Sequence, residues 1–328
     1  MLAFRRALSD LGLGGRIIAA DPSESAPTLY LADAALLTPA SEAPDYLDVL
    51  LEFCERQGVG LVIPLADEDL EGLARACPRF AEAGVRILVS PPWVVETCRD
   101  GLRLADFLKR SGVLTPEVMT YQRALDGPFP LVLKQRLGAA AHRIRRIPDR
   151  EALAACWSGD DGTIIQPCVK GDPFIVDVYA GLGGPAKVAV PRRQYRVCAR
   201  EARAAQTVRH PEIIGQALRL GDALKECVGV MAIRCRLTPA GEVVVTEVAP
   251  HLDDGAALSI RAGADFPRWI IQEHLGQKPD CDPEVWQDGL VGLRHDAEVF
   301  RRSDQILTPW PSRSRAVAGG RTKAEMSD

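Results

Sequence analysis

The segment between residues 231 and 276 constrains the fold of this chain more than any other part of the sequence. Two runs of mainly apolar residues, Met231 to Leu237 and Glu242 to Val248, are separated by Thr-Pro-Ala-Gly at positions 238–241. Proline in the second position and glycine in the fourth are typical of a tight turn. The pattern therefore predicts a β-hairpin.

Side chains of opposite charge fall on the two strands of this hairpin. A four-residue turn places Arg234 opposite Val245. It also places Ala232 opposite Glu247, which makes Arg234 and Glu247 diagonal neighbours on one face of the sheet. We therefore expect a guanidinium group and a carboxylate to meet on that face.

The hairpin and the helix that follows it resemble the signature of the ATP-grasp superfamily, most closely its carbamoyl-phosphate-synthase-like branch of carboxylate–amine ligases. There the second strand ends in Glu-x-Asn-Pro-Arg and a helix opens with Ala-Gly-Ala-Asp-Phe-Pro. This chain has Glu-Val-Ala-Pro-His at 247–251 and the second motif at 262–267. The resemblance implies an α/β chain with an N-terminal parallel-sheet domain, lacking its usual first strand, and then the two-lobed α+β ATP-grasp fold.

Family members hold the magnesium ions that bridge the ATP phosphates with Gln, Glu and Asn side chains of this hairpin. This chain has Arg234, Glu247 and Ala249 at those positions. A guanidinium group cannot ligate magnesium and keeps its charge, so we expect Arg234 to pair with Glu247. A second possibility stays open, in which Asp253 and Asp254 join Glu247 as substitute magnesium ligands.

Composition limits the classes of partner. A net charge of -4 and a pI near 5.8 give no general attraction to nucleic acid or to an anionic membrane. The nine cysteines include no C-x-x-C pair, which fits reduced thiols rather than a zinc site or a disulfide framework. No apolar run is long enough to cross a bilayer. We therefore expect a cytoplasmic protein without a nucleic-acid or membrane partner.

The N-terminal part alternates helical and strand patterns, which is typical of a parallel sheet with crossover helices. We expect helices at 2–11, 45–57, 67–76 and from Pro92, and strands at 16–20, 61–65 and 85–90. With the resemblance, this predicts an N-terminal domain at 1–98, a small lobe at 99–175 and a large lobe at 176–300. The basic tail at 301–328 has few apolar residues and is expected to be disordered.

The residues expected to bind the ATP phosphates lie around a strand predicted at 129–135. Lys134 matches the lysine that family members place on these phosphates, and Arg136 follows it. In family members a Gly- and Ser-rich loop follows, whose N–H groups close over phosphate oxygens. Of that loop's glycines, this chain has Gly138. Asp100-Gly101 replaces the family's phosphate-binding Asp-Lys. The alternative for Lys134 and Arg136 is a pair of solvated charges at a strand end.

The hinge that contacts adenine is expected just after residue 163. Gln166 matches the first residue of the family's motif, whereas Pro167 and Pro173 replace the glutamates that contact adenine and ribose. Proline offers neither a carboxylate nor an N–H group. The backbone groups of Cys168 and Val169 would still face an adenine edge.

Candidate catalytic residues are Arg192, Arg193 and His251. The two arginines match positions that relatives use near the substrate and the phosphates, and His251 replaces the arginine of the signature. Arginine groups bind carboxylates in two-pronged geometry, although a solvated basic loop is the alternative. The acidic run at 67–69 opens a helix just past a strand end, where ligands bind in open α/β sheets and where acidic residues also complement the helix dipole.

Family members use ATP and magnesium to phosphorylate a carboxylate, and an amine then displaces the phosphate. Because the adenine, ribose, loop and metal positions all differ here, the sequence favours a homologue that is inactive or altered in chemistry. Its partner would be a small-molecule carboxylate, another acidic ligand or a partner protein. An active ATP-dependent carboxylate–amine ligase, with Glu247 and Asp253 or Asp254 on magnesium, is the alternative, and a scaffold without a ligand is a third possibility.

Overall fold

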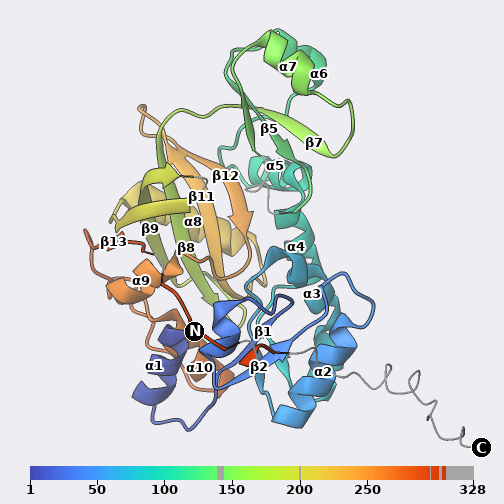
Figure 1. The fold of residues 1–328 in the computed structure, drawn as a ribbon. Helices are drawn as coiled ribbons and strands as arrows, with labels where there is room; N and C mark the ends of the chain where they lie inside the picture. The colour runs from blue at the N-terminus through green and yellow to red at the C-terminus, as the bar shows by residue number, and fades with distance from the viewer. Residues whose placement is uncertain (139–143, 199–200, 296, 303–304, 308–328) are drawn as a thin grey trace, which may run out of the picture.

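The computed structural model describes residues 1–138, 144–198, 201–295, 297–302 and 305–307, without the side chains of residues 196–203. Figure 1 shows an N-terminal domain in blue, a small lobe in green at the top, and a large lobe built around the yellow and orange strands. Most of the tail expected to be disordered, and the loop that follows Gly138, lie outside the described residues.

The N-terminal domain pairs its strands in parallel, as predicted. Its elements are α1 (Leu2–Asp10), β1 (Ile18–Asp21), the 3-10 helix η1 (Pro27–Tyr30), β2 (Ala34–Leu37), α2 (Tyr46–Gln57), β3 (Leu61–Val62), α3 (Asp67–Glu82), β4 (Arg86–Ile87) and α4 (Pro92–Arg99). The parallel pairing is divided between two two-stranded sheets, in which β1 pairs with β2 and β3 pairs with β4. Strand β2 was not predicted, since two of its four residues are alanine, which has a low β propensity.

The small lobe is a three-stranded antiparallel sheet in the order β6-β5-β7. Its elements are α5 (Gly101–Arg110), α6 (Tyr121–Leu125), β5 (Leu131–Gln135), β6 (Arg145–Ile147), α7 (Arg150–Cys156) and β7 (Thr163–Pro167). Leu131, Leu133, Ile147, Leu153 and Ile165 form its core. Figure 1 shows α6 and α7 side by side at the top of this lobe.

The large lobe is a six-stranded antiparallel sheet in the order β12-β11-β8-β9-β10-β13. Its elements are β8 (Asp172–Gly181), β9 (Val188–Cys198), β10 (Glu201–Thr207), α8 (Pro211–Ala223), β11 (Gly229–Leu237), β12 (Val243–Ala249), α9 (Ala256–Ala262), α10 (Phe266–His274) and β13 (Val291–Leu293). The predicted hairpin is confirmed as β11 and β12.

The two faces of the six-stranded sheet bury different side chains of β8. Val176 and Val178 join the core under α8, whereas Tyr179 joins a second core with Phe266 and Trp269 of α10. Asp177 lies between these apolar positions and is fully buried. Since side chains alternate along a strand, Asp177 belongs to the face of Tyr179.

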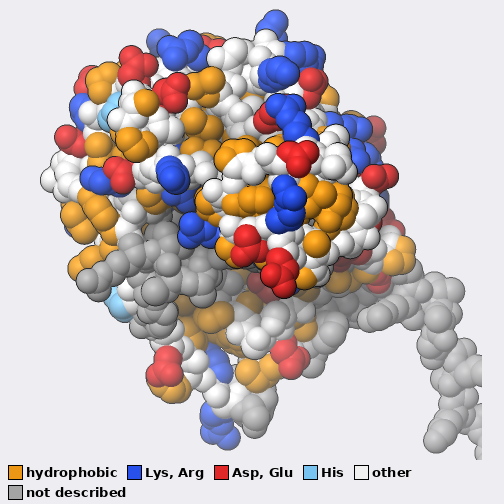
Figure 2. Space-filling model, turned by 90° about the horizontal axis from the view of Figure 1, so that it is seen from above, with side chains coloured by type: hydrophobic (Ala, Val, Ile, Leu, Met, Phe, Trp, Pro, Cys, Tyr) orange, Lys and Arg blue, Asp and Glu red, His pale blue; other side chains and the backbone are white. Residues whose placement is uncertain are grey.

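On the face of the molecule seen from above, neither positively nor negatively charged side chains predominate. Figure 2 shows Lys and Arg side chains interspersed with Asp and Glu side chains over that face. Among the described residues, no helix is both long and apolar enough to cross a membrane.

Candidate functional site

The hairpin brings Arg234 and Glu247 together in a different register from the predicted one. Arg234 lies directly opposite Glu247, and Cys235 lies opposite Val245. The turn is longer than predicted because Glu242 stays in it, and β12 therefore begins at Val243.

A β-bulge completes the change of register. Thr246 lies between the paired positions of Val245 and Glu247, and its hydroxyl donates to the carbonyl oxygen of Arg234 at 3.2 Å. A bulge gives one strand an extra residue and re-aims the side chains beyond it. Glu247 is therefore a direct and not a diagonal neighbour of Arg234.

Arg234 joins two carboxylates. Its Nε lies 3.3 Å from Oε1 of Glu247, and its Nη2 donates to Oδ2 of Asp253 at 3.2 Å. The predicted pairing with Glu247 is confirmed. Burial opposes ionisation of Asp253, but the charges of Arg192 and Arg234 hold the pKa of that carboxyl below its usual range.

Arg192 occupies the centre of the same face. Its Nε donates to Oδ2 of Asp177 at 2.7 Å, and its Nη2 donates to Oδ1 of Asp177 at 2.8 Å and to Oδ1 of Asp253 at 3.0 Å. Ser259 donates to Asp177 as well, at 2.5 Å. We call the connected set of Asp177, Arg192, Arg234, Glu247 and Asp253 the ionic network.

Arg193 does not belong to the ionic network. It donates to Asp172 at 2.7 Å, and its guanidinium lies 5.6 Å from the ring centre of Tyr195. Successive residues of a strand point to opposite faces, so Arg192 and Arg193 cannot both reach one site. The two arginine side chains therefore point to opposite faces of the sheet.

The predicted magnesium ligands do not fit a magnesium ion. Glu247 and Asp253 contact Arg234, and Asp254 is exposed. In the part of the chain that the structure describes, no group of three or more His, Cys, Asp or Glu residues could hold a metal. Magnesium requires near-octahedral oxygen ligands, whereas a guanidinium group brings only N–H donors to this position.

The predicted phosphate-binding residues are held by internal contacts to different degrees. Arg136 donates through Nη2 to Asp100 at 2.8 Å, and Gly138 donates its N–H to the carbonyl oxygen of Arg99 at 3.0 Å. Lys134 is buried and donates to the carbonyl oxygen of Thr246 at 3.1 Å. Burial lowers the pKa of Lys134. Arg136 is thus paired with the carboxylate of Asp100, whereas Lys134 donates its hydrogen bond to a backbone oxygen.

Two of the three residues predicted to lie near adenine are held by internal hydrogen bonds. Gln166 is buried and donates its side-chain amide to the carbonyl oxygen of Pro116 at 2.9 Å. The N–H group of Cys168 donates to the carbonyl oxygen of Pro130 at 3.1 Å. Val169 follows β7 and is half-buried. Of these three residues, Gln166 and Cys168 are therefore tied by these bonds to other parts of the chain.

His251 links the hairpin to the N-terminal domain. Its Nε2 lies 3.3 Å from Oδ1 of Asp67, and its Nδ1 lies 3.1 Å from the carbonyl oxygen of Leu252. Both partners are acceptors, so this geometry suits the doubly protonated ring. Burial opposes that charge, but Asp67 raises the pKa of His251 above its usual value, and His251 with nearby arginines lowers the pKa of Asp67.

Replacing His251 by Asn is expected to lower the free energy of unfolding by about 1–2 kcal/mol at about pH 6. Because the folded pKa of His251 lies above 6.5, the stabilisation is complete below that pH and is lost as the pH rises through the folded pKa. The loss should therefore be smaller at about pH 9 in urea unfolding. A His274→Asn control should show the reverse trend, since burial lowers the pKa of that ring. An equal loss for His251→Asn at both pH values would contradict the charged pair.

A cavity of about 600 Å³ opens beside the ionic network. Arg192, Arg234 and Asp253 line it together with Gln194 and Arg261. Among the described residues, no hydrogen bond or ion pair involves the guanidinium group of Arg261. Gln194 and Arg261 were not predicted, although Gln194 directly follows Arg193 and Arg261 directly precedes the motif at 262–267.

Two family models match the chain. Residues 2–88 match a PylC-like N-terminal domain, and residues 98–253 match an ATP-grasp domain. No curated protein matches the sequence.

Solved structures share the fold at low identity. Biotin carboxylase from Campylobacter jejuni, solved as a β,γ-ATP complex, has a TM-score of 0.70 at 14% identity, over 88% of this chain and 71% of that one. L-Amino acid ligase from Bacillus licheniformis has a TM-score of 0.66 at 18% identity, over 84% and 71%. N5-carboxyaminoimidazole ribonucleotide synthetase from Thermotoga maritima has a TM-score of 0.62 at 19% identity, over 87% and 76%. The resemblance of the hairpin and the following helix is confirmed, and the chain belongs to the ATP-grasp superfamily.

Proposed function

We propose that this chain is an ATP-grasp homologue of the carboxylate–amine ligases that does not carry out magnesium-dependent phosphoryl transfer. One observation carries the proposal. The guanidinium group of Arg234 lies 3.3 Å from Glu247 and 3.2 Å from Asp253, in the place where the family's hairpin would hold its metal.

The physical reason lies in the charge that a metal supplies. In phosphoryl transfer, magnesium ions bridge the phosphates and neutralise the charge that develops on their oxygens. Arg234 supplies one positive charge to this position, and Glu247 and Asp253 already compensate it. A magnesium ion would have to displace the guanidinium group and leave it without a carboxylate partner in a partly buried site.

The nucleotide contacts support the same proposal. Arg136 is paired with Asp100, Gln166 is bonded to Pro116, and the N–H group of Cys168 is bonded to Pro130. A group that left its protein partner to contact ATP would lose that bond, which lowers the net gain from the new contact. Two classes of ligand then remain for this chain. One is an acidic small molecule in the cavity beside Arg261, and the other is a partner protein.

Lys134 favours the alternative, an active ATP-dependent ligase. Its ammonium group is buried, and its hydrogen bond goes to a backbone oxygen rather than to a carboxylate. A phosphate oxygen would replace that acceptor with a charged one, and charged hydrogen bonds are stronger.

Calorimetric titration with a nonhydrolysable ATP analogue separates the two functions. The wild-type chain is expected to bind no analogue at about 1 mM, with or without magnesium. The double variant Arg234→Gln, Ala249→Asn restores the family's metal ligands, and it should gain magnesium-dependent affinity only if the rest of the nucleotide site persists. Arg193→Gln, on the opposite face, is the matched control and should gain none. Magnesium-dependent binding by the wild-type chain would overturn the proposal in favour of the active ligase.

A further inference from the structure

Building on the proposed function, which leaves the cavity beside the ionic network to a small molecule, we propose that Arg192 and Gln194 bind a neutral carboxamide group of that molecule. The two side chains present a hydrogen-bond donor and a hydrogen-bond acceptor to the same cavity. We call this pair of residues the amide subsite.

The amide subsite lies on one face of the six-stranded sheet. Arg192 and Gln194 are two residues apart on β9, so their side chains point to the same face. Both line the cavity of about 600 Å³, although Arg192 is 2% and Gln194 is 9% exposed. Gln194 lies opposite Ala205 of β10, and Ala205 lies opposite Gly292 of β13. These small residues leave the face of the sheet beside Gln194 open to the cavity.

Each side chain of the amide subsite keeps one polar group without a partner. Gln194 donates from Nε2 to the carbonyl oxygen of Arg192 at 3.0 Å. A carbonyl oxygen can accept but not donate, so this bond fixes the orientation of the side-chain amide and leaves Oε1 as an acceptor. Arg192 uses Nε and Nη2 for Asp177 and Asp253. Among the described residues, no hydrogen bond involves Oε1 of Gln194 or Nη1 of Arg192.

Gly255 leaves Nη1 of Arg192 uncovered. The backbone of Gly255 has φ -77° and ψ -11°, a right-handed conformation that does not require glycine. A Cβ atom there would lie 2.0 Å from Nη1 of Arg192 and would cover it. Because Gly255 also lines the cavity, its lack of a side chain gives a ligand room beside this group.

Hydrogen-bond complementarity identifies the group that fits the amide subsite. A carboxamide has a C=O acceptor and an N–H donor side by side. Its oxygen would accept from Nη1 of Arg192, and its N–H group would donate to Oε1 of Gln194. A carboxylate has acceptors alone, so one of its oxygens would face Oε1 of Gln194 without a hydrogen between them. A buried acceptor that loses its donor costs free energy, and the subsite therefore favours the carboxamide.

The charges of the ionic network also oppose a buried anion at this place. Its guanidinium groups, on Arg192 and Arg234, already face the carboxylates of Asp177, Asp253 and Glu247. A further negative charge beside Arg192 would add to these carboxylates in a buried position, which is costly. An acidic group elsewhere on the ligand would instead contact Arg261, which is exposed.

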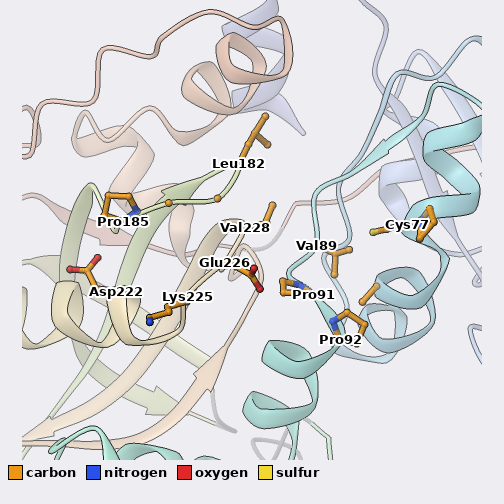
Figure 3. A pocket seen from close by; sticks show the side chains of 14 residues that line it. Cys77, Val89, Pro91, Pro92, Leu182, Pro185, Asp222, Lys225, Glu226 and Val228 are labelled. Carbon is orange, nitrogen blue, oxygen red and sulfur yellow. The ribbon is translucent and has the colours of Figure 1, made fainter.

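A second cavity, of about 800 Å³, lies between the N-terminal domain and the large lobe (Figure 3). Its charged side chains, Asp222, Lys225 and Glu226, are exposed to solvent. Water satisfies exposed groups, so they place little demand on a ligand. The buried groups of the amide subsite have less access to water and therefore select a ligand more strongly.

Calorimetric titration of the full chain, without nucleotide or magnesium, tests the proposal with three probes of similar shape. Leu258, Leu290 and Val291 line the cavity and suit the apolar body that the probes share. We expect 3-methylbutanamide to bind, and 3-methylbutanoate and 4-methylpentan-2-one to bind at least about tenfold more weakly. The ketone lacks the N–H donor, and the carboxylate lacks the donor and carries a charge.

The proposal is overturned if the amide does not bind at about 20 mM, or if the ketone or the carboxylate binds as tightly as the amide. Because no nucleotide is present, either result would leave the titration with the ATP analogue, and with it the proposed function, unaffected.

Two variants assign the binding to Gln194. Gln194→Met removes the acceptor and keeps the length of the side chain, so it should weaken binding of the amide about tenfold and leave the ketone unaffected. Gln216→Met is the matched control, because Gln216 also donates to a backbone oxygen, that of Val243 at 3.2 Å, but lies on α8 outside the cavity. It should change the affinity for neither probe. An equal loss for the amide and the ketone in Gln194→Met, or no loss for either, would overturn the proposal.

Discussion

Replacing Asp177 by Ala is expected to lower the free energy of unfolding by about 3–5 kcal/mol. Asp177 is 0% exposed and holds Arg192, which is 2% exposed, through two hydrogen bonds. Without Asp177, the guanidinium group stays buried with Asp253 as its remaining carboxylate partner. A buried charge that loses a partner costs far more than an exposed one, because water cannot replace the missing contact.

Asp172→Ala is the matched control for this change. Asp172 and Arg193 form the corresponding pair between the same two strands, but their side chains are 51% and 41% exposed. Exposed ion pairs contribute about 0–1 kcal/mol, so this variant should unfold at nearly the wild-type urea concentration. A similar loss for both variants would show that burial does not set the strength of the Asp177–Arg192 pair.

Replacing Gly255 by Ala is expected to destabilise the chain by about 2–3 kcal/mol through the same network. A Cβ atom at Gly255 would lie 2.0 Å from Nη1 of Arg192, which is far inside van der Waals contact. Arg192 would have to move, and it could not do so while keeping its bonds to Asp177 and Asp253. Urea unfolding measures the loss.

Gly72→Ala provides the control with the opposite sign. Gly72 lies inside α3, and a Cβ atom added there would meet nothing within 4 Å. Alanine in a helix is favoured over glycine by about 0.8–1.0 kcal/mol, so this variant should be more stable than the wild-type chain. A Gly255→Ala variant of unchanged stability would mean that Arg192 has a second stable position.

The sequence predicted the hairpin and its pairing of charges, but it could not predict the register. Pro239 and Gly241 signalled the turn, and the opposite charges of Arg234 and Glu247 signalled their contact. The bulge at Thr246 depends on a side-chain hydroxyl that bonds a neighbouring strand, and no local pattern encodes that bond. The register differs from the predicted one by two one-residue shifts, one in the turn and one at the bulge. Together they make Glu247 the direct neighbour of Arg234 rather than a diagonal one.

Sequence reasoning named four of the five residues of the ionic network but missed the fifth, Asp177. Arg192 was named because it matches a family position, and Asp253 because it follows the hairpin closely, whereas Asp177 was not predicted. A lone Asp inside the apolar run Phe174 to Ala180 was the available signal, since a buried charge requires a partner of opposite sign. Its partner lies 15 residues away on the adjacent strand, and that distance is set by the fold rather than by local spacing.

The boundary between the two family models does not coincide with a boundary between folding units. Leu88, the last residue of the PylC-like match, is buried in one cluster with Trp269 and Phe266 of the large lobe, and Phe4 of α1 packs against the same cluster. Figure 1 shows α1 beside α10, at the opposite end of the sequence. Cutting the chain between the two matches would divide a hydrophobic core. The two matched regions should therefore unfold together as a single cooperative unit.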